Sequence, residues 1–137
     1  GIKIPFNLGL EGHSDADPVL HALIDSLLGA CRLGDIGKLF SDKNKKYKNI
    51  RSTILLKKVI KLIKSKNFSI NNIDINIILQ KPKIKKYTNK MIKIISEICE
   101  INKNQINIKG KSTEKLGIIG KEKAIASEVL ASVIKYV

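Results

Sequence analysis

The chain has 137 residues and an apolar fraction of 43%, which fits one compact domain with a core of normal size. It holds no run of 18 uncharged apolar residues, so no membrane-spanning helix is expected. The net charge of +14, from 26 basic and 12 acidic residues, normally raises nucleic acid as a partner. Every basic residue except Arg32 and Arg51 is Lys, however, and aromatic residues make up only 4%, which disfavours base reading and stacking. We therefore interpret the charge as a lysine-rich, solvated surface.

The first predicted elements are a short strand at residues 2–6 and a long helix. Asp17 can cap this helix, Pro18 suits its first position, and apolar residues continue to Leu33. Gly34 is then expected to end the helix.

Periodic apolar patterns predict the remaining elements. They are a helix that Ser52 caps and that runs to about Lys66, a strand at 72–79, a helix at 88–100, a strand at 105–109, and an ambiguous tail at 123–137. This order predicts a mixed α/β domain. Cys31 and Cys99 lie in apolar, helix-like stretches and are expected to be buried free thiols.

Residues 12–21 form the densest cluster of polar groups, and they contain both histidines of the chain, His13 and His21. His21 lies one turn into the predicted helix, near an N-terminus that suits a phosphate. Asp25 lies one turn further along the same face, where it could accept a hydrogen bond from His21 and fix its tautomer. From the residues alone, a functional and a structural role for this cluster are about equally supported.

Two other clusters leave two interpretations open. In residues 33–42, glycines flank Asp35, which fits either a loop that approaches a ribose or phosphate or a helix end followed by a turn. In residues 109–117, Ser112, Thr113 and Glu114 could bind a phosphate and a hard cation, or form a capping box.

Taken in order, these clusters resemble one enzyme family. Gly-His-Ser-Asp-Ala-Asp at 12–17 with His21, Leu-Gly-Asp-Ile-Gly-Lys at 33–38 and Ser-Thr-Glu-Lys-Leu-Gly at 112–117 closely resemble the 2-C-methyl-D-erythritol 2,4-cyclodiphosphate synthases. The resemblance spans essentially the whole chain in one register. It implies a single domain over residues 1–137, of α/β (α+β) class, with a four-stranded mixed sheet covered by helices on one face. It also implies that the tail is a strand paired with 105–110.

The resemblance further implies an enzyme of the non-mevalonate isoprenoid pathway. Its substrate would be 4-diphosphocytidyl-2-C-methyl-D-erythritol 2-phosphate, and its products 2-C-methyl-D-erythritol 2,4-cyclodiphosphate and CMP. It would be a metal-assisted phosphorus–oxygen lyase that uses Zn²⁺ with Mg²⁺ or Mn²⁺. It would form a homotrimer with active sites at subunit interfaces, and would bind neither nucleic acid nor membrane. The alternatives are a basic nucleic-acid-binding domain and a catalytically inactive trimeric scaffold.

Site roles follow from the same resemblance. His21 matches a zinc ligand and Glu114 the site of the second cation, whereas His13 and Ser112 match groups that stabilise the transition state. The residues that match substrate-binding positions are Ser14; Asp35, Ile36 and Gly37; the flap Phe40, Ser41, Asp42, Lys43 and Asn44; the cytosine-pocket segment Leu79, Gln80, Lys81, Pro82, Lys83, Ile84 and Lys85; and Lys111, Thr113, Ile118 and Lys121.

The chain departs from the family pattern at three places. It lacks the Asp-x-His pair of zinc ligands that precedes the first strand in the family, and it begins with Gly1, so we expect an N-terminal segment to be missing. Lys111 stands where a small hydroxyl residue is usual, and Asn44 replaces an acidic residue. The Lys, Asn and Ile bias favours an apicoplast-type plastid, with the bacterial cytoplasm as the alternative.

Overall fold

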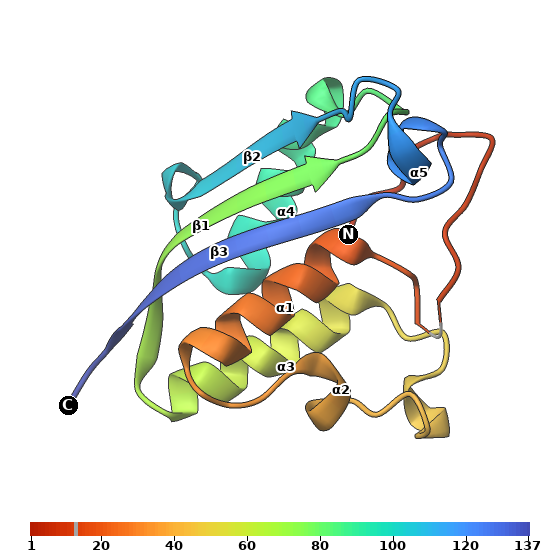
Figure 1. Ribbon diagram of the computed structural model, residues 1–137. Helices are drawn as coiled ribbons and strands as arrows, with labels where there is room; N and C mark the ends of the chain where they lie inside the picture. The colour runs from red at the N-terminus through yellow and green to blue at the C-terminus, as the bar shows by residue number, and fades with distance from the viewer. Residues whose placement is uncertain (13) are drawn as a thin grey trace.

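A computed structural model describes residues 1–12 and 14–137 of the chain (Figure 1). The elements in chain order are α1 (Pro18–Ala30), α2 (Ile36–Leu39), η1 (Lys45–Tyr47), α3 (Ser52–Ser65), β1 (Phe68–Ile78), η2 (Lys85–Tyr87), α4 (Thr88–Cys99), η3 (Lys103–Gln105), β2 (Ile106–Lys111), α5 (Gly117–Gly120) and β3 (Ala126–Lys135). The predicted mixed α/β class is confirmed. Within these residues, no helix combines the length and the apolar character that crossing a membrane requires.

The sheet has the strand order β2-β1-β3, with β1 at its centre. β1 and β2 run parallel, and β3 runs antiparallel to β1, so that Ile75 lies between Ile108 and Val129. The prediction of four strands is therefore wrong, because the described residues form a sheet of three. The tail is a strand, as expected, but it pairs with β1 and not with residues 105–110. The sequence pattern of a strand shows its faces but not its neighbour.

Residues 2–6 account for the missing strand. They have no regular secondary structure, although Ile4 is partly buried and packs against the core. Pro5 has no N–H to donate to a strand ladder, and the apolar alternation over so few residues requires only that Ile4 face the core. The pattern therefore reports burial in this segment and not strand pairing.

Helices α1, α3 and α4 cover one face of the sheet, as predicted (Figure 1). Helix α1 begins as expected, with Leu20 N–H donating to Asp17 Oδ1 at 2.9 Å. It ends earlier than predicted, because Arg32 takes the left-handed conformation (φ 57°) and Leu33 N–H donates to Leu28 O at 2.8 Å. Helix α3 also differs, because Ser52 is its first helical residue and not its cap.

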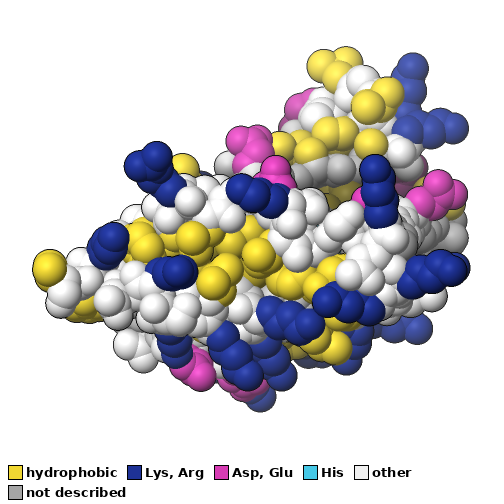
Figure 2. All heavy atoms as spheres, turned by 90° about the horizontal axis from the view of Figure 1, so that it is seen from below, with side chains coloured by type: hydrophobic (Ala, Val, Ile, Leu, Met, Phe, Trp, Pro, Cys, Tyr) yellow, Lys and Arg dark blue, Asp and Glu magenta, His cyan; other side chains and the backbone are white. Residues whose placement is uncertain are grey.

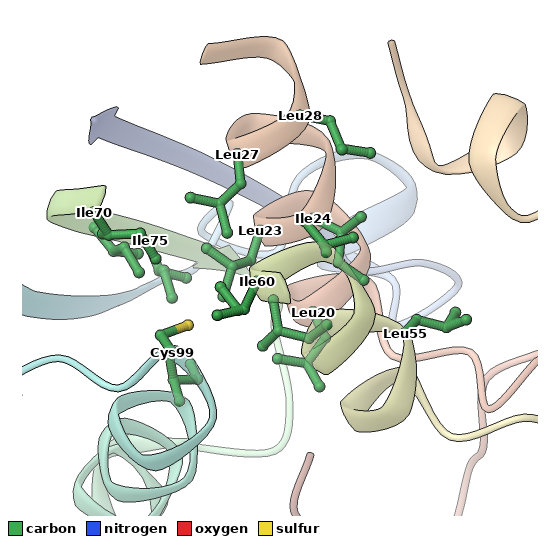
Figure 3. Close-up of a cluster of buried hydrophobic side chains, with 14 of the residues drawn as sticks. Leu20, Leu23, Ile24, Leu27, Leu28, Leu55, Ile60, Ile70, Ile75 and Cys99 are labelled. Carbon is green, nitrogen blue, oxygen red and sulfur yellow. The ribbon is translucent and has the colours of Figure 1, made fainter. Parts of the chain in front are cut away.

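The core lies between the helices and the sheet (Figure 3). Fully buried side chains come from α1 (Leu23), α3 (Leu56) and β1 (Ile75). Cys31 and Cys99 are both buried and free, which confirms the sequence-based expectation. Burial raises the pKa of Cys99 to about 12, so this thiol is held in its protonated form.

The opposite face of the sheet is not covered by any described helix (Figure 1). Asp74 on β1 accepts hydrogen bonds there from Lys109 Nζ at 2.8 Å and Asn107 Nδ2 at 3.2 Å, both on β2. Leu130 on β3, which is paired with Asp74, is 77% exposed. On the face seen in Figure 2, Lys and Arg side chains are spread out with hydrophobic side chains between them, which agrees with a solvated charge.

Candidate active site

The N-terminal end of α1 brings Ser14 and His21 together. His21 lies one turn into the helix, and its backbone N–H donates to Asp17 O at 3.0 Å. Its Nε2 lies 3.1 Å from Ser14 Oγ, and its side chain is one-third exposed (33%). The imidazole is thus fixed by the helix yet open to a ligand. His13 was also predicted to belong to this site, and it lies outside the described residues.

Asp15 faces both His21 and the start of α3. Its Oδ2 accepts from Ser52 N–H at 2.8 Å, its Oδ1 accepts from the Ser52 hydroxyl, and Oδ1 also lies 4.0 Å from His21 Nε2. Burial by itself would raise the pKa of the Asp15 carboxyl, but the hydrogen bonds from Ser52 outweigh it and the pKa lies below its ordinary value. Asp15 therefore carries a negative charge that satisfies the backbone N–H of Ser52, the first residue of α3.

Asp25 has a different partner from the one predicted. Its Oδ1 accepts from Ile36 N–H at 2.7 Å, so the expected hydrogen bond with His21 is replaced by a bond to the loop after α1. Asp35 accepts from Lys38 N–H at 2.7 Å and caps α2. Gly34, with φ +91°, makes the turn between the two helices. These contacts agree with the structural interpretation of the 33–42 cluster, a helix end followed by a turn, and they leave its ligand-binding interpretation as a prediction.

A cavity of about 490 Å³ joins this helix end to the loop that follows α2. Six of its lining residues were predicted as site residues: Ser14, His21, Ile36, Gly37, Phe40 and Asp42. The sequence analysis missed other lining residues, among them Leu10, Tyr47 and Leu55. Tyr47 packs edge-on against Phe40, with ring centroids 5.4 Å apart. An aromatic residue within a lysine-rich loop was the signal that could have identified Tyr47.

The remaining flap residues shape the loop. Lys43 N–H donates to Ser41 Oγ at 3.3 Å, and Asn44 Oδ1 accepts from Lys46 N–H at 3.1 Å and caps η1. The side chain of Asn44, expected near the ligand, therefore stabilises the flap itself.

The predicted cytosine-pocket segment and the third cluster lie side by side at the ends of β1 and β2. Leu79 N–H donates to Lys111 O at 2.9 Å, and Lys115 N–H donates to Gln80 Oε1 at 2.9 Å. Ser112 Oγ accepts from Glu114 N–H at 3.2 Å. These contacts connect the two segments, which the sequence separates by about 30 residues.

The other predicted residues surround this loop. Thr113 Oγ1 donates to Leu116 O at 2.7 Å, Ile118 is 68% exposed in α5, and Lys121 follows α5 as its cap. A second hollow of about 630 Å³ is lined by Pro5, Pro82, Lys83, Lys85, Lys86 and Tyr87. Of the remaining predicted residues, Ile84 is buried and Lys81 is exposed.

The two halves of the predicted site do not meet within the described part of one chain. The cavity that contains His21 is lined by neither Ser112 nor Glu114. No three His, Cys, Asp or Glu side chains among residues 1–12 and 14–137 lie close enough to hold a metal ion. The imidazole of His21 fits one position of a tetrahedral zinc site, but these residues do not supply a full ligand set.

Comparison with known proteins assigns the chain to a family. The model of the YgbB family matches residues 1–134. The chain belongs to the YgbB family. One relative, the bifunctional enzyme IspD/IspF of Pelagibacter ubique, is 66% identical over 98% of the chain. The chain covers 36% of that protein, and so spans about a third of its length.

The chain covers most of the length of two further relatives. The 2-C-methyl-D-erythritol 2,4-cyclodiphosphate synthase of Caldicellulosiruptor bescii is 50% identical over 93% of the chain and 81% of that protein. The solved CDP complex of IspF from Plasmodium falciparum is 42% identical, with a TM-score of 0.82 over 93% of the chain and 76% of that structure.

These relatives support neither a nucleic-acid-binding domain nor an inactive scaffold. Both curated relatives named here are bacterial, so the expected plastid-type origin is not supported.

Proposed function

We propose that this YgbB-family chain is a phosphorus–oxygen lyase of isoprenoid biosynthesis that forms 2-C-methyl-D-erythritol 2,4-cyclodiphosphate. Its substrate is 4-diphosphocytidyl-2-C-methyl-D-erythritol 2-phosphate, and CMP is released. The observation that carries the proposal is the cavity that gathers Ser14 and His21 from one predicted cluster and Ile36, Gly37 and Phe40 from another. The enzyme name borne by a relative that is 50% identical supports it.

The reaction is a displacement at phosphorus within one molecule. An oxygen of the substrate's 2-phosphate attacks the phosphorus next to the erythritol, a new P–O bond forms, and the P–O bond to CMP breaks. The attacking oxygen is already anionic at neutral pH, so no strong base is needed. Two unit charges about 4 Å apart in water repel by roughly 1 kcal/mol, and by more in a dry site. The protein must therefore position two anionic groups that repel each other.

The residues of the cavity fit this task. The Ser14 hydroxyl can donate a hydrogen bond to a phosphate at the start of α1, which carries partial positive charge, and the His21 imidazole lies beside it as a proposed metal ligand. Ile36, Phe40 and Leu55 supply apolar walls that limit the access of water to the reacting phosphorus. Asp35 and Gly37 are proposed to meet the erythritol part of the substrate. His13 and Ser112 are proposed to donate hydrogen bonds as charge moves to the leaving CMP.

We propose Leu79–Lys85 as the segment that receives the cytosine base. The hydrogen bonds of this segment with Lys111 and Lys115 connect it to the loop of Ser112 and Glu114. A relative with 42% identity has been solved as a CDP complex, which supports a cytidine nucleotide as the ligand.

Zn²⁺ with Mg²⁺ or Mn²⁺ is proposed as the cofactor set, with His21 as one zinc ligand and Glu114 as a ligand of the second cation. Bound to phosphates, such cations neutralise charge and polarise the phosphorus. Replacement of Glu114 by Gln is expected to raise the Mg²⁺ or Mn²⁺ concentration needed for half-maximal CMP release, and an unchanged metal titration would count against this role.

A homotrimer with active sites between subunits is the proposed assembly. The separation of His21 from Glu114 within the described residues of one chain supports it, as does the uncovered face of the sheet with Leu130 exposed. Light scattering coupled to gel filtration measures the mass directly, and a stable monomer would contradict the proposal. The bacterial relatives support the bacterial cytoplasm as the proposed compartment.

The decisive experiment is an assay of CMP release with the full-length natural protein and the diphosphocytidyl substrate. We expect turnover in the unmodified protein and none in His21→Ala. Ser65→Ala is the matched control, because it removes a hydroxyl that bonds only Leu62 O at the far end of α3. Near-normal turnover in His21→Ala would refute the role of His21, and the absence of CMP release from the unmodified protein would refute the function.

A further inference from the structure

One wall of the cavity is a continuous segment, residues 36–52, whose two ends are both held by carboxylates from the region of α1. At the first end, Asp25 Oδ1 accepts from Ile36 N–H at 2.7 Å. At the second end, Asp15 accepts from Ser52 N–H at 2.8 Å and from the Ser52 hydroxyl. The partners are 11 and 37 residues apart in the sequence, so both bonds are tertiary contacts.

Both bonds satisfy the first backbone N–H of a helix, a group that has no acceptor within its own helix. Ile36 begins α2 and Ser52 begins α3. Arg51, which precedes α3, makes no capping hydrogen bond with its side chain, so Asp15 takes the place of the missing cap. Because each acceptor is a carboxylate, the bonds are charge-assisted and stronger than neutral ones.

Between these ends the segment has few buried anchors. Phe40 is buried and holds Tyr47 by their edge-to-face contact, whereas the lysines on either side of Tyr47 are exposed. Asn49 has a left-handed conformation, with φ 58°. The position of the wall therefore depends strongly on its two ends.

We propose that Asp25 and Asp15 are positioning residues that fix the two ends of residues 36–52 and so hold this wall opposite Ser14 and His21. The kinetic consequence of this proposal rests on the proposed function. The mechanical consequence, a wall that loosens when an end is released, does not depend on it.

The test compares Asp25→Ala with Asp25→Asn in the full-length protein. The Asn side chain keeps an oxygen that can accept from Ile36 N–H, whereas the Ala side chain has none. Brief trypsin treatment followed by mass spectrometry measures the cleavage rate at the exposed Lys43, Lys45, Lys46 and Lys48. Loss of one charge-assisted bond predicts cleavage about tenfold faster in Asp25→Ala, whereas Asp25→Asn, which keeps a neutral bond, should lie between Asp25→Ala and the unmodified protein. Equal rates in all three proteins, or equal acceleration in both variants, would overturn the proposal.

The second end is tested through Ser52→Ala, which removes the hydroxyl bond to Asp15 and keeps the backbone bond. We expect faster cleavage at the same lysines and no change in the Ser65→Ala control. If Ser52→Ala were cleaved at the same rate as the unmodified protein, the proposed role of Asp15 would be refuted. Should Asp25→Ala fail to fold, hydrogen exchange on the unmodified protein decides: slow exchange of the Ile36 and Ser52 amides supports the proposal, and fast exchange of either overturns it.

Enzyme kinetics then separate positioning from chemistry. In Asp25→Ala we expect the KM of the diphosphocytidyl substrate to rise about tenfold with a smaller change in kcat, and Asp25→Asn to restore part of this loss. If Asp25 acted through its charge on His21, both variants would lose kcat equally, and the proposal would fail. If the unmodified protein releases no CMP, the proposed function fails, but the cleavage rates still decide whether the wall is held in this way.

Discussion

Replacement of Gly120 by Ala tests how closely α5 packs against the loop of Ser112 and Glu114. A Cβ atom at position 120 would lie 2.2 Å from Lys115 C and 2.7 Å from Lys115 O. Both are backbone atoms, so no side-chain rotation can relieve the overlap. Gly120 does not have a positive φ, and Ala favours a helix over Gly by about 1 kcal/mol, so the substitution would stabilise the protein if space allowed.

The overlap decides whether Gly120→Ala stabilises or destabilises the protein. Excess volume in a packed site typically costs about 1–3 kcal/mol, and an overlap with backbone belongs at the upper end of this range. We expect a net loss of about 2 kcal/mol, which lowers the melting temperature by about 7 °C for a domain of this size. CMP release should also fall, because Lys115 follows Glu114 directly and is bonded to Gln80.

Gly29→Ala is the matched control, because Gly29 is also helical and an added Cβ would meet nothing within 4 Å. This variant should be more stable by about 0.5–1 kcal/mol. Thermal unfolding followed by circular dichroism measures both proteins. A melting temperature of Gly120→Ala equal to or above that of the unmodified protein would show that the turn at Lys115 yields easily and that the close packing has no consequence.

Three further perturbations have defined outcomes. Leu56→Ala empties a fully buried site and should lower the free energy of unfolding in urea by about 2–5 kcal/mol, and a loss below 1 kcal/mol would mean that the core collapses around the gap. Cys99 should resist iodoacetamide at pH 8 in the folded protein and react after unfolding, because burial raises its pKa to about 12; rapid labelling of the native thiol would contradict its burial. Hydrogen bonds from Lys109 and then Asn107 lower the pKa of Asp74, so its stabilising contribution is complete well above its ordinary pKa of 3.8 and is lost as the pH falls through the folded-state value. Asp74→Asn should therefore lower stability by more at pH 6 than at pH 2, and a loss that is the same at both values would exclude this titration.

Sequence patterns identified the long helices and strands because the buried face of each one requires apolar residues at regular spacing. The apolar spacing in α3 and α4 and the alternation in β1 each describe one element's own buried face, which a single segment can reveal. Strand pairing depends on two segments at once, and for this reason residues 2–6 and the partner of β3 were predicted incorrectly.

In the candidate site, too, features within one segment could be predicted, whereas contacts between segments could not. Ser14 and His21 are seven residues apart, on either side of the predicted start of α1, so the sequence alone places them near the same helix end. Asp25 was assigned to His21 on the same reasoning, but the free N–H of Ile36 competes for its carboxylate, and this loop amide is not visible in a helical pattern. Tyr47 was overlooked because its lysine-rich neighbours made the segment resemble an ordinary exposed loop.

The position of β1 at the centre of the sheet has a consequence for synthesis of the protein. Its antiparallel neighbour, β3, is formed by residues 126–135, about 50 residues after β1 has left the ribosome. Until those residues emerge, one edge of β1 presents unpaired N–H and C=O groups beside a largely formed hydrophobic layer, a situation that favours aggregation. Nascent chains halted before residue 126 should therefore bind chaperones, and release should coincide with the appearance of β3.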